Sequence, residues 1–513
     1  MQKLNELLWE DSEMKQISKN LGSNFLFSFI VILIIGLVNI GYPLLIGFLY
    51  SAETMGNFAV LFNWAFFLAI PIANGIAPAI SRFIAAKTGD ETPQINKIGG
   101  KITIFYLLMA LVIFPFIGVF VFQLDIFDLL IVISMLIIVI LHYLFRYSLQ
   151  GQERFSRLFK FEILSFVIFL PFMVLFGILP NILGWTGLTG FHWLFVPVIA
   201  YHLAFDIVYL IVETKKMDFK EFFSFPEITK KILLYALFVG IGSLFSLGVS
   251  QIQIIISNEY LTEFRVGVLG FWDSAIKPIS LISVAIGAMT IPRITNLQKS
   301  KEEYDVSFVN RINYALTLLI LPIFGLIFLI VAGYPNLFDH LGLTKYQTAI
   351  YWIIPIFLSF QVVNNLIATP TISYYSSSER KVIINPIISF AYSLIVIVSW
   401  IILVPRWDIW GFVSGIAIGS LVFSLAIQIT ALIITKRKIG MHVFVMLAFY
   451  VLGGVSLILL NYISIIVLLV LWSCITISSV IIGILLLIKV LKNRDYSITY
   501  EEQATILDET SKF

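Results

Sequence analysis

Two oppositely charged residues, Asp273 and Lys277, stand four positions apart in the segment GFWDSAIKP, which lies in an otherwise apolar stretch. Residues at i and i+4 share one face of a helix, and an acid followed by a base is the favourable order for an ion pair. A lysine ammonium is also a point charge that binds phosphate. The pair is therefore either a closed structural ion pair or a binding group for an anion.

A second pair with the same spacing, His202 and Asp206, lies in another apolar run. Histidine changes its charge near neutral pH, so this pair could take up and release protons in support of ion coupling. The two residues could equally form a hydrogen bond between packed helices. The sequence leaves both interpretations open.

Single polar side chains interrupt several other apolar runs and are candidate lining residues of a wet cavity: Asn39, Asn63, Asn74, Gln251 and Asn364. For each of them the alternative is an interhelical hydrogen bond worth under about 1 kcal/mol. Arg82 and Arg293 close two of the runs. Each either anchors its helix at an interface or receives an anionic head group.

The amino-acid composition indicates whether these residues lie in a soluble protein or in a membrane protein. The chain has 513 residues, of which 59% are hydrophobic and 12% charged, with a mean hydropathy of +0.99. Soluble proteins carry roughly a quarter charged residues, so this chain is a polytopic membrane protein. A net charge of +3, spread over short loops, does not indicate a nucleic-acid partner.

About fourteen apolar segments approach the ~20 residues that cross a bilayer core. They are 23–50, 57–82, 100–123, 126–149, 160–180, 191–213, 231–257, 266–293, 308–333, 347–369, 382–404, 410–435, 441–461 and 463–490. The expected fold class is an all-α membrane protein of about fourteen transmembrane helices. Residues 1–22 are charged, lack a cleavable signal pattern, and are expected to form an amphipathic segment on the membrane surface.

Positive charges set the expected orientation. Of the 33 Lys and Arg residues, only Arg265, Lys345 and Arg406 fall on one face, and Lys277 alone remains within a span. The other face, which carries nearly all of them, is expected to be cytoplasmic. Both termini are then cytoplasmic, including the polar tail 491–513. Lys277 would lie about 16 Å deep, near the middle of a ~30 Å core.

A faint internal repeat divides the spans. The second span (Gly56 to Arg82) and the eighth (Gly267 to Arg293) have the same length and a basic residue at the same end. The exits SLQGQER and YYSSSER are likewise six spans apart. Duplicated halves predict a first lobe at 23–213, a linker at 214–230, a second lobe at 231–435, and two further helices at 441–490.

The first two spans, the YSLQGQERF exit, the AIGAMTIPRI close of span eight and the ATPTISYYSSSERKVIINPII turn resemble polysaccharide-biosynthesis flippases of the Wzx type. These belong to the multidrug/oligosaccharidyl-lipid/polysaccharide exporter superfamily. The resemblance implies two six-helix lobes in a V around a central cavity, two extra C-terminal helices, and alternating access. It also implies a polyprenyl-linked sugar as substrate, a prokaryotic cell membrane as location, and glycosyltransferases or a polymerase as pathway partners.

Physical chemistry is consistent with that function, because a sugar head cannot cross hydrocarbon unaided. A carrier needs a polar cavity and a cation for the phosphate, which favours Lys277 with Asp273 as its resting partner. The alternative is a cation-coupled multidrug exporter of the same superfamily. No GxxxxGK[ST] or HExxH motif is present, so an enzyme is not expected, nor is a cofactor or metal. Coupling to Na⁺, H⁺ or the membrane potential is left open.

Overall fold

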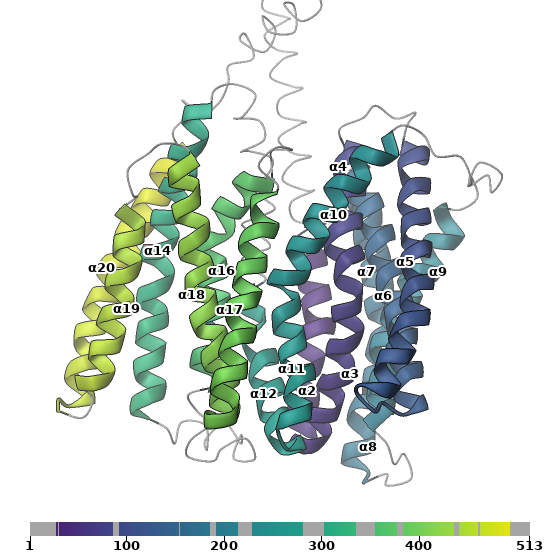
Figure 1. Cartoon of the computed structure of the whole chain (residues 1–513), viewed down its shortest axis with the longest axis horizontal. Coiled ribbons are helices and arrows are strands. Elements are labelled where there is room, and N and C mark those ends of the chain that lie inside the picture. The colour runs from purple at the N-terminus through teal and green to yellow at the C-terminus, as the bar shows by residue number, and fades with distance from the viewer. Residues whose placement is uncertain are drawn as a thin grey trace, which may run out of the picture. The chain divides into compact units, whose positions relative to one another are not determined.

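The structure is a computed structural model that describes residues 27–28, 30–85, 92–152, 154–184, 191–213, 228–280, 302–334, 354–376, 383–434, 441–459 and 462–492. Within these ranges the chain forms helices and turns and no strand (Figure 1). A segment in lipid must satisfy its backbone hydrogen bonds internally, and a helix does so. The expected all-α class is confirmed.

Eleven described helices are long and apolar enough to cross a membrane, and the number is twelve if one bent pair of helices forms a single span. The eleven are Ile30–Leu49, Ala52–Ile84, Ile98–Phe120, Ile126–Gly151, Phe155–Ile182, Phe191–Glu213, Val309–Gly333, Ile354–Tyr375, Ile384–Trp407, Ile409–Ile433 and Ile465–Ile488. Each coincides with an expected span. The chain is therefore a multi-pass membrane protein.

The expected count of fourteen is not confirmed, and the three other spans show why. The seventh is bent by 45° between α10 (Ile228–Ser246) and α11 (Gly248–Tyr260). The eighth begins with α12 (Glu263–Ile276), and the part of this span after residue 280 lies outside the described residues. The thirteenth, α19 (Met441–Leu459), has a described apolar stretch of only Val443–Ser456.

The chain divides into two compact units, Met1–Leu281 and Ile282–Phe513. In the first unit, α3 (Ala52–Ile70) packs against α11 and α12, and η2 (Pro71–Ile76) packs against α10. Helices α10 to α12, expected in the second lobe, thus belong to the compact unit of the first. A lobe boundary at 214–230 stays a prediction.

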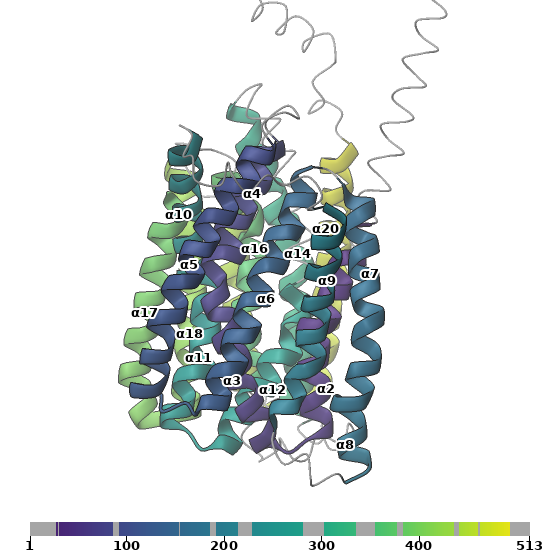
Figure 2. The same ribbon diagram turned by 90° about the vertical axis from the view of Figure 1, so that its right-hand side faces the viewer.

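The remaining helices of the first unit form a layer that Figure 2 shows face on. It consists of α5 (Thr92–Phe120), α6 (Ile126–Gly151), α7 (Phe155–Phe172) and α9 (Val196–Glu213). Two elements precede α3 in the chain, η1 (Leu37–Gly41) and α2 (Tyr42–Leu49), and α4 (Ala77–Ala85) follows η2 and precedes α5. Three short elements connect α7 to α9: η4 (Met173–Ile178), α8 (Leu179–Ile182) and η5 (Phe191–Phe195).

The second unit contains α14 (Glu302–Gly333), α16 (Ile354–Ser376), α17 (Ile384–Trp407), α18 (Ile409–Ile434), α19 and α20 (Ile465–Lys492). Helix α14 packs against α16, α19 and α20, and α18 packs against α16 and α17. Its core includes Leu321, Val363, Ile367 and Met446.

The two segments with the faint repeat pack directly against each other as α3 and α12. A Cβ added at Gly267 would lie 1.7 Å from the Ala52 carbonyl oxygen, and one added at Gly56 would lie 2.6 Å from that of Glu263. Glycine lets the backbones of two membrane helices come this close together, because any side chain at these positions would hold them apart. These two glycines therefore fix α12, and with it the Asp273–Lys277 pair, against α3.

Large apolar side chains cover the outside of α5. Val112, Phe116 and Phe120 are exposed by 74%, 65% and 71%. An apolar surface of this kind is stable in hydrocarbon and unfavourable in water. The outer face of the first unit thus has the character expected of a lipid-facing surface.

Candidate functional site

The Asp273–Lys277 pair forms as the spacing predicts. Lys277 Nζ lies 2.6 Å from Asp273 Oδ2, and the two side chains are 23% and 10% exposed. Asp273 is on α12, and Lys277 is the residue that ends this helix; its amide donates to the Asp273 carbonyl at 3.2 Å. Substrate binding by the pair stays a prediction.

His202 and Asp206 lie in a buried polar cluster that the sequence revealed only in part. His202 Nε2 is 3.3 Å from Asn39 Oδ1 of η1, so Asn39 contacts this cluster. The ring of His202 packs at 4.7 Å from the ring of His142 on α6. Neither residue of the expected pair bonds to the other: both Asp206 oxygens and His202 Nδ1 are buried without a hydrogen-bond partner in the described structure.

Glu162 on α7 is the member of the cluster that sequence reasoning missed. Its side chain is fully buried, and Tyr201 donates a short hydrogen bond to its Oε2. His142 Nε2 lies 3.3 Å from Glu162 Oε1, within ion-pair distance, although neither atom makes a hydrogen bond. The sequence does show an acid in the apolar run FKFEILSFVIFL. This acid lies so close to the end of its span that it resembles an interfacial residue.

The cluster gathers ionisable groups from three helices into the interior of the first unit. Beside the two histidines and two carboxylates it includes Arg146 on α6, which is 8% exposed and whose Nε has no hydrogen-bond partner within the described ranges. A carboxylate without a partner in an apolar interior costs several kcal/mol when charged. Such a group is stabilised by a proton or by a bound cation.

Three other expected cavity residues, Asn63, Asn74 and Gln251, lie in different surroundings. Asn63 is buried and donates to the Ala59 carbonyl at 2.7 Å. Asn74 is half-buried in η2, where its carbonyl accepts a 3.5 Å hydrogen bond from Ser243. Gln251 is half-buried on α11, and its buried Oε1 lacks a partner among the described residues. A cavity-lining role for these three stays a prediction.

Asn364 lies in the second unit and bridges three helices. Its amide nitrogen is 3.3 Å from Ser420 Oγ on α18, and its Oδ1 accepts a short hydrogen bond from Tyr450 on α19. The side chain has no exposed surface. These contacts match the structural alternative stated for the isolated polar residues, while a cavity role for Asn364 stays untested.

Arg82 connects α4 to α10. Its guanidinium carbon lies 4.5 Å from the centre of the Tyr235 ring, a cation–π contact. Its Nη1 is buried and makes no hydrogen bond in the described part of the chain. Arg293 lies outside the described residues.

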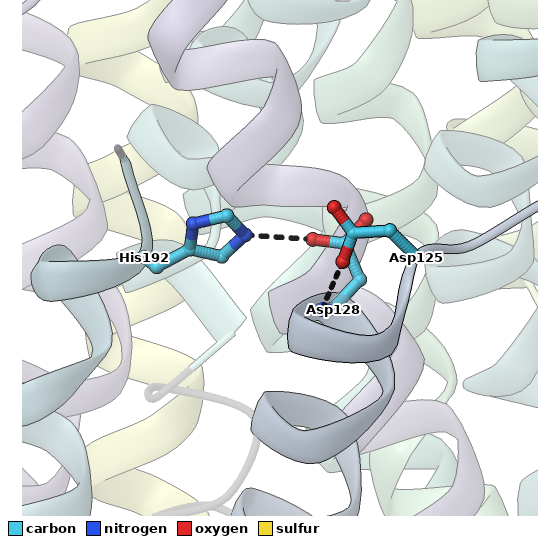
Figure 3. A group of neighbouring side chains, drawn as sticks. All are labelled: Asp125, Asp128 and His192. Atoms are coloured by element: carbon cyan, nitrogen blue, oxygen red, sulfur yellow. Dashed lines mark hydrogen bonds and ion pairs between the residues drawn. The ribbon is translucent and has the colours of Figure 1, made fainter. Parts of the chain in front are cut away.

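A third group of ionisable side chains, Asp125, Asp128 and His192, was not singled out from the sequence (Figure 3). One ligand atom from each lies within 4.8 Å of the others, close enough for a metal ion. Local structure accounts for all three: Asp125 accepts the Asp128 amide at 2.8 Å as the N-cap of α6, and His192 Nε2 lies 2.9 Å from Asp128 Oδ1. The group needs no ion to be satisfied.

This fold is shared by known transporters. It is similar to "Lipid II flippase MurJ, inward closed conformation" at 14% identity, with a TM-score of 0.58 over 89% of this chain and 97% of that chain. It is also similar to a multidrug resistance MATE family transporter of the MOP superfamily in an outward-facing conformation, at 16% identity and a TM-score of 0.55 over 82% and 97%. A eukaryotic MATE transporter, AtDTX14, is similar at 13% identity and a TM-score of 0.53, over 83% of this chain and 98% of that chain. The protein thus has the fold of the MurJ and MATE transporters.

The family follows from the sequence match. Residues 21–298, more than half of the chain, match the family model described as "Polysaccharide biosynthesis protein", and the chain belongs to this family. No curated protein matches the sequence. The resemblance read from the two spans and their exit motifs is confirmed. At identities of 13–16%, the structural neighbours define the fold and not the substrate.

Proposed function

We propose that this protein translocates a lipid-linked oligosaccharide across the cytoplasmic membrane of a prokaryote by alternating access. Membership of the polysaccharide biosynthesis family and the transporter fold support this class of function. The observation that carries the proposal is the ion pair of Lys277 and Asp273 at the C-terminal end of α12, with 2.6 Å between Nζ and Oδ2. Both termini are cytoplasmic in this proposal.

Lys277 supplies the cation for the phosphate or pyrophosphate that joins sugar to lipid. A charged residue in a membrane helix costs about 2.5 to 3.5 kcal/mol on insertion scales, so it needs a partner in every state. Asp273 is that partner before substrate binds. A bound phosphate would replace Asp273 at the ammonium, and release of the phosphate would restore the pair.

The buried cluster on α6, α7 and α9 supports a second part of the proposal, which is ion coupling. Asp206 has two buried oxygens without partners, and Glu162 faces both Tyr201 and His142. A proton or a sodium ion taken up from outside would neutralise these carboxylates and shift the equilibrium between conformations. Coupling through this cluster would let an ion gradient drive export.

A gene deletion tests the substrate class. Lipid-linked oligosaccharide should accumulate on the cytoplasmic side of the membrane when the protein is absent, and surface glycan should fall. Glycan export that continues normally, together with altered sensitivity to organic cations, would contradict the proposal. Pathway glycosyltransferases or a polymerase would then no longer be expected as partners.

The second candidate is a cation-coupled multidrug exporter, and one observation favours it. Glu162 and Asp206 are buried acids inside the first unit, as a carrier of organic cations requires. The same fold occurs in MATE transporters. Lys277 argues against this candidate, because a lysine in the transport path would repel an organic cation.

A further inference from the structure

The first unit contains an apolar groove that no part of the proposed mechanism uses. It has a volume of about 580 Å³. Its walls are formed by α5, by α10, and by α3 together with η2, which continues from α3. This volume is within the ~300–1,000 Å³ of ligand pockets in general. Tyr106 is one of the lining residues. Its hydroxyl donates a hydrogen bond to the Leu68 carbonyl at 2.5 Å and so has a partner.

The groove is long and follows the helices. Its lining runs along α5 from Ile102 to Ile117, about 22 Å at ~1.5 Å per residue, and along α10 from Leu233 to Leu244, about 16 Å. The small residues Ala110 and Gly240 belong to the lining. A hydrocarbon chain aligned with the membrane normal has this shape and chemistry.

A cation stands near one end of the groove. Arg82 packs on Tyr235, which is on the same turn of α10 as the lining residues Leu233 and Leu237. The buried Nη1 of Arg82 has no hydrogen-bond partner among the residues described. By the distribution of Lys and Arg, this is the cytoplasmic end. An apolar channel with a guanidinium near its cytoplasmic end matches an amphiphile with a long tail and an anionic head.

We propose that this groove binds the polyprenyl tail of the lipid-linked substrate on the cytoplasmic side, with its phosphate or pyrophosphate at Arg82. The inference rests on the proposed function, since it takes its substrate class from there. An arginine fork binds phosphate oxygens in a bidentate manner, and the Nη1 donor supplies one of the two hydrogen bonds. The groove is a first binding site on α5 and α10, separate from the Lys277 site on α12.

Photolabelling of the full-length protein in nanodiscs tests this assignment. The probe is a polyprenyl pyrophosphate with a diazirine in its tail, and mass spectrometry locates the label. Labelling is expected on α5 and α10, at lining residues such as Met109 and Leu237. Excess unlabelled polyprenyl pyrophosphate should remove it, whereas phosphatidylglycerol and inorganic pyrophosphate should not. Equal competition by phosphatidylglycerol would show a site for ordinary membrane lipid and overturn the proposal.

Two pairs of variants make the test specific. Ala110→Phe fills the groove, and Val112→Phe places the same ring on the exposed face of the same helix as a matched control. Arg82→Gln removes the charge, and Arg82→Lys keeps it. Ala110→Phe and Arg82→Gln should each lower labelling about tenfold, because the first removes the space for the tail and the second removes a charge-assisted contact to the phosphate. Val112→Phe should leave labelling unchanged.

Thermal unfolding of each variant shows whether a loss of labelling reflects a loss of fold. Should Ala110→Phe be unstable, Arg82→Gln against Arg82→Lys decides the question alone. Unchanged labelling in stable Ala110→Phe and Arg82→Gln overturns the groove assignment. If the deletion strain still accumulates cytoplasmic lipid-linked oligosaccharide in that case, the proposed function stands without the groove; if it does not, both fail.

Discussion

Lys277 Nζ lies 2.6 Å from Asp273 Oδ2, one helical turn away, and both side chains are largely buried at the end of α12. The pair is neutral as a whole, whereas either partner alone would leave an unpaired charge inside the protein. Removing one partner of a buried pair is strongly destabilising for that reason. An anion that takes the ammonium of Lys277 leaves the Asp273 carboxylate without its partner, so that carboxylate must then be hydrated, protonated or paired with another cation.

Lys277→Ala should abolish transport while the protein still inserts in the membrane. Lys277→Arg keeps the charge and should retain part of the activity, and Asp273→Asn should be milder than Lys277→Ala. The expected loss for Lys277→Ala is at least about tenfold, the equivalent of ~1.4 kcal/mol of lost substrate binding. The measurement is uptake of lipid-linked oligosaccharide by inverted vesicles, corrected for the amount of inserted protein.

The double variant Asp273→Asn with Lys277→Gln separates a structural pair from a binding group. Both charges are gone, so no unpaired charge remains to destabilise the helix. Normal transport by this variant would mean that the pair only stabilises α12, and Lys277 would no longer be the phosphate group.

Gly267→Ala should lower the thermal stability of the protein by the equivalent of about 1–3 kcal/mol, the usual cost of overpacking. The new methyl would lie 1.7 Å from the Ala52 carbonyl oxygen, so α12 must move away from α3. Gly453→Ala on α19 is the matched control, since a Cβ there meets nothing within 4 Å. Its melting temperature should stay the same or rise. Equal melting temperatures for both variants would show that the close α3–α12 contact does not hold in the membrane.

Asp206→Asn and Glu162→Gln should uncouple transport from an imposed ion gradient. Each change removes a carboxylate that could carry a proton or bind a cation, while leaving the shape of the side chain nearly unchanged. Gradient-driven uptake in proteoliposomes should fall about tenfold or more, with little change in exchange without a gradient.

Glu213→Gln serves as the control for the coupling experiment. Glu213 forms ion pairs with the exposed Arg154 and Arg157 at 3.0 and 2.7 Å, and such surface pairs contribute about 0–1 kcal/mol. This variant should keep its response to the gradient. Coupling that survives in both Asp206→Asn and Glu162→Gln would remove the buried cluster from the mechanism.

Asn364→Ala should reduce stability and leave transport intact. The change breaks the bonds to Ser420 and Tyr450, and interhelical hydrogen bonds of membrane proteins contribute about 0.6 kcal/mol each on average. Denaturation in detergent should show a small loss, with transport per folded molecule unchanged. A large loss of transport at full stability would instead return Asn364 to the substrate path.

Several features of this protein follow from the sequence alone because they depend on local chemistry. A run of about 20 apolar residues must cross the bilayer as a helix, which placed eleven spans and the bent seventh close to their observed bounds. The Asp273–Lys277 pair is likewise local, since a spacing of four residues in a helix brings the two side chains together whatever surrounds them.

Only the tertiary structure decided which helices meet, because a partner on another span depends on the rotation and packing of both helices. His202 and Asp206 have the same spacing of four, yet His202 contacts Asn39 and His142 instead. Glu162 became a candidate once packing placed it beside His142 and Tyr201. The contact of Gly267 with Ala52 and the groove between α5 and α10 also join residues far apart in the chain. The hydrophobic effect, which drives spans into the membrane, does not distinguish one apolar helix face from another in lipid; close packing and interhelical hydrogen bonds make that choice.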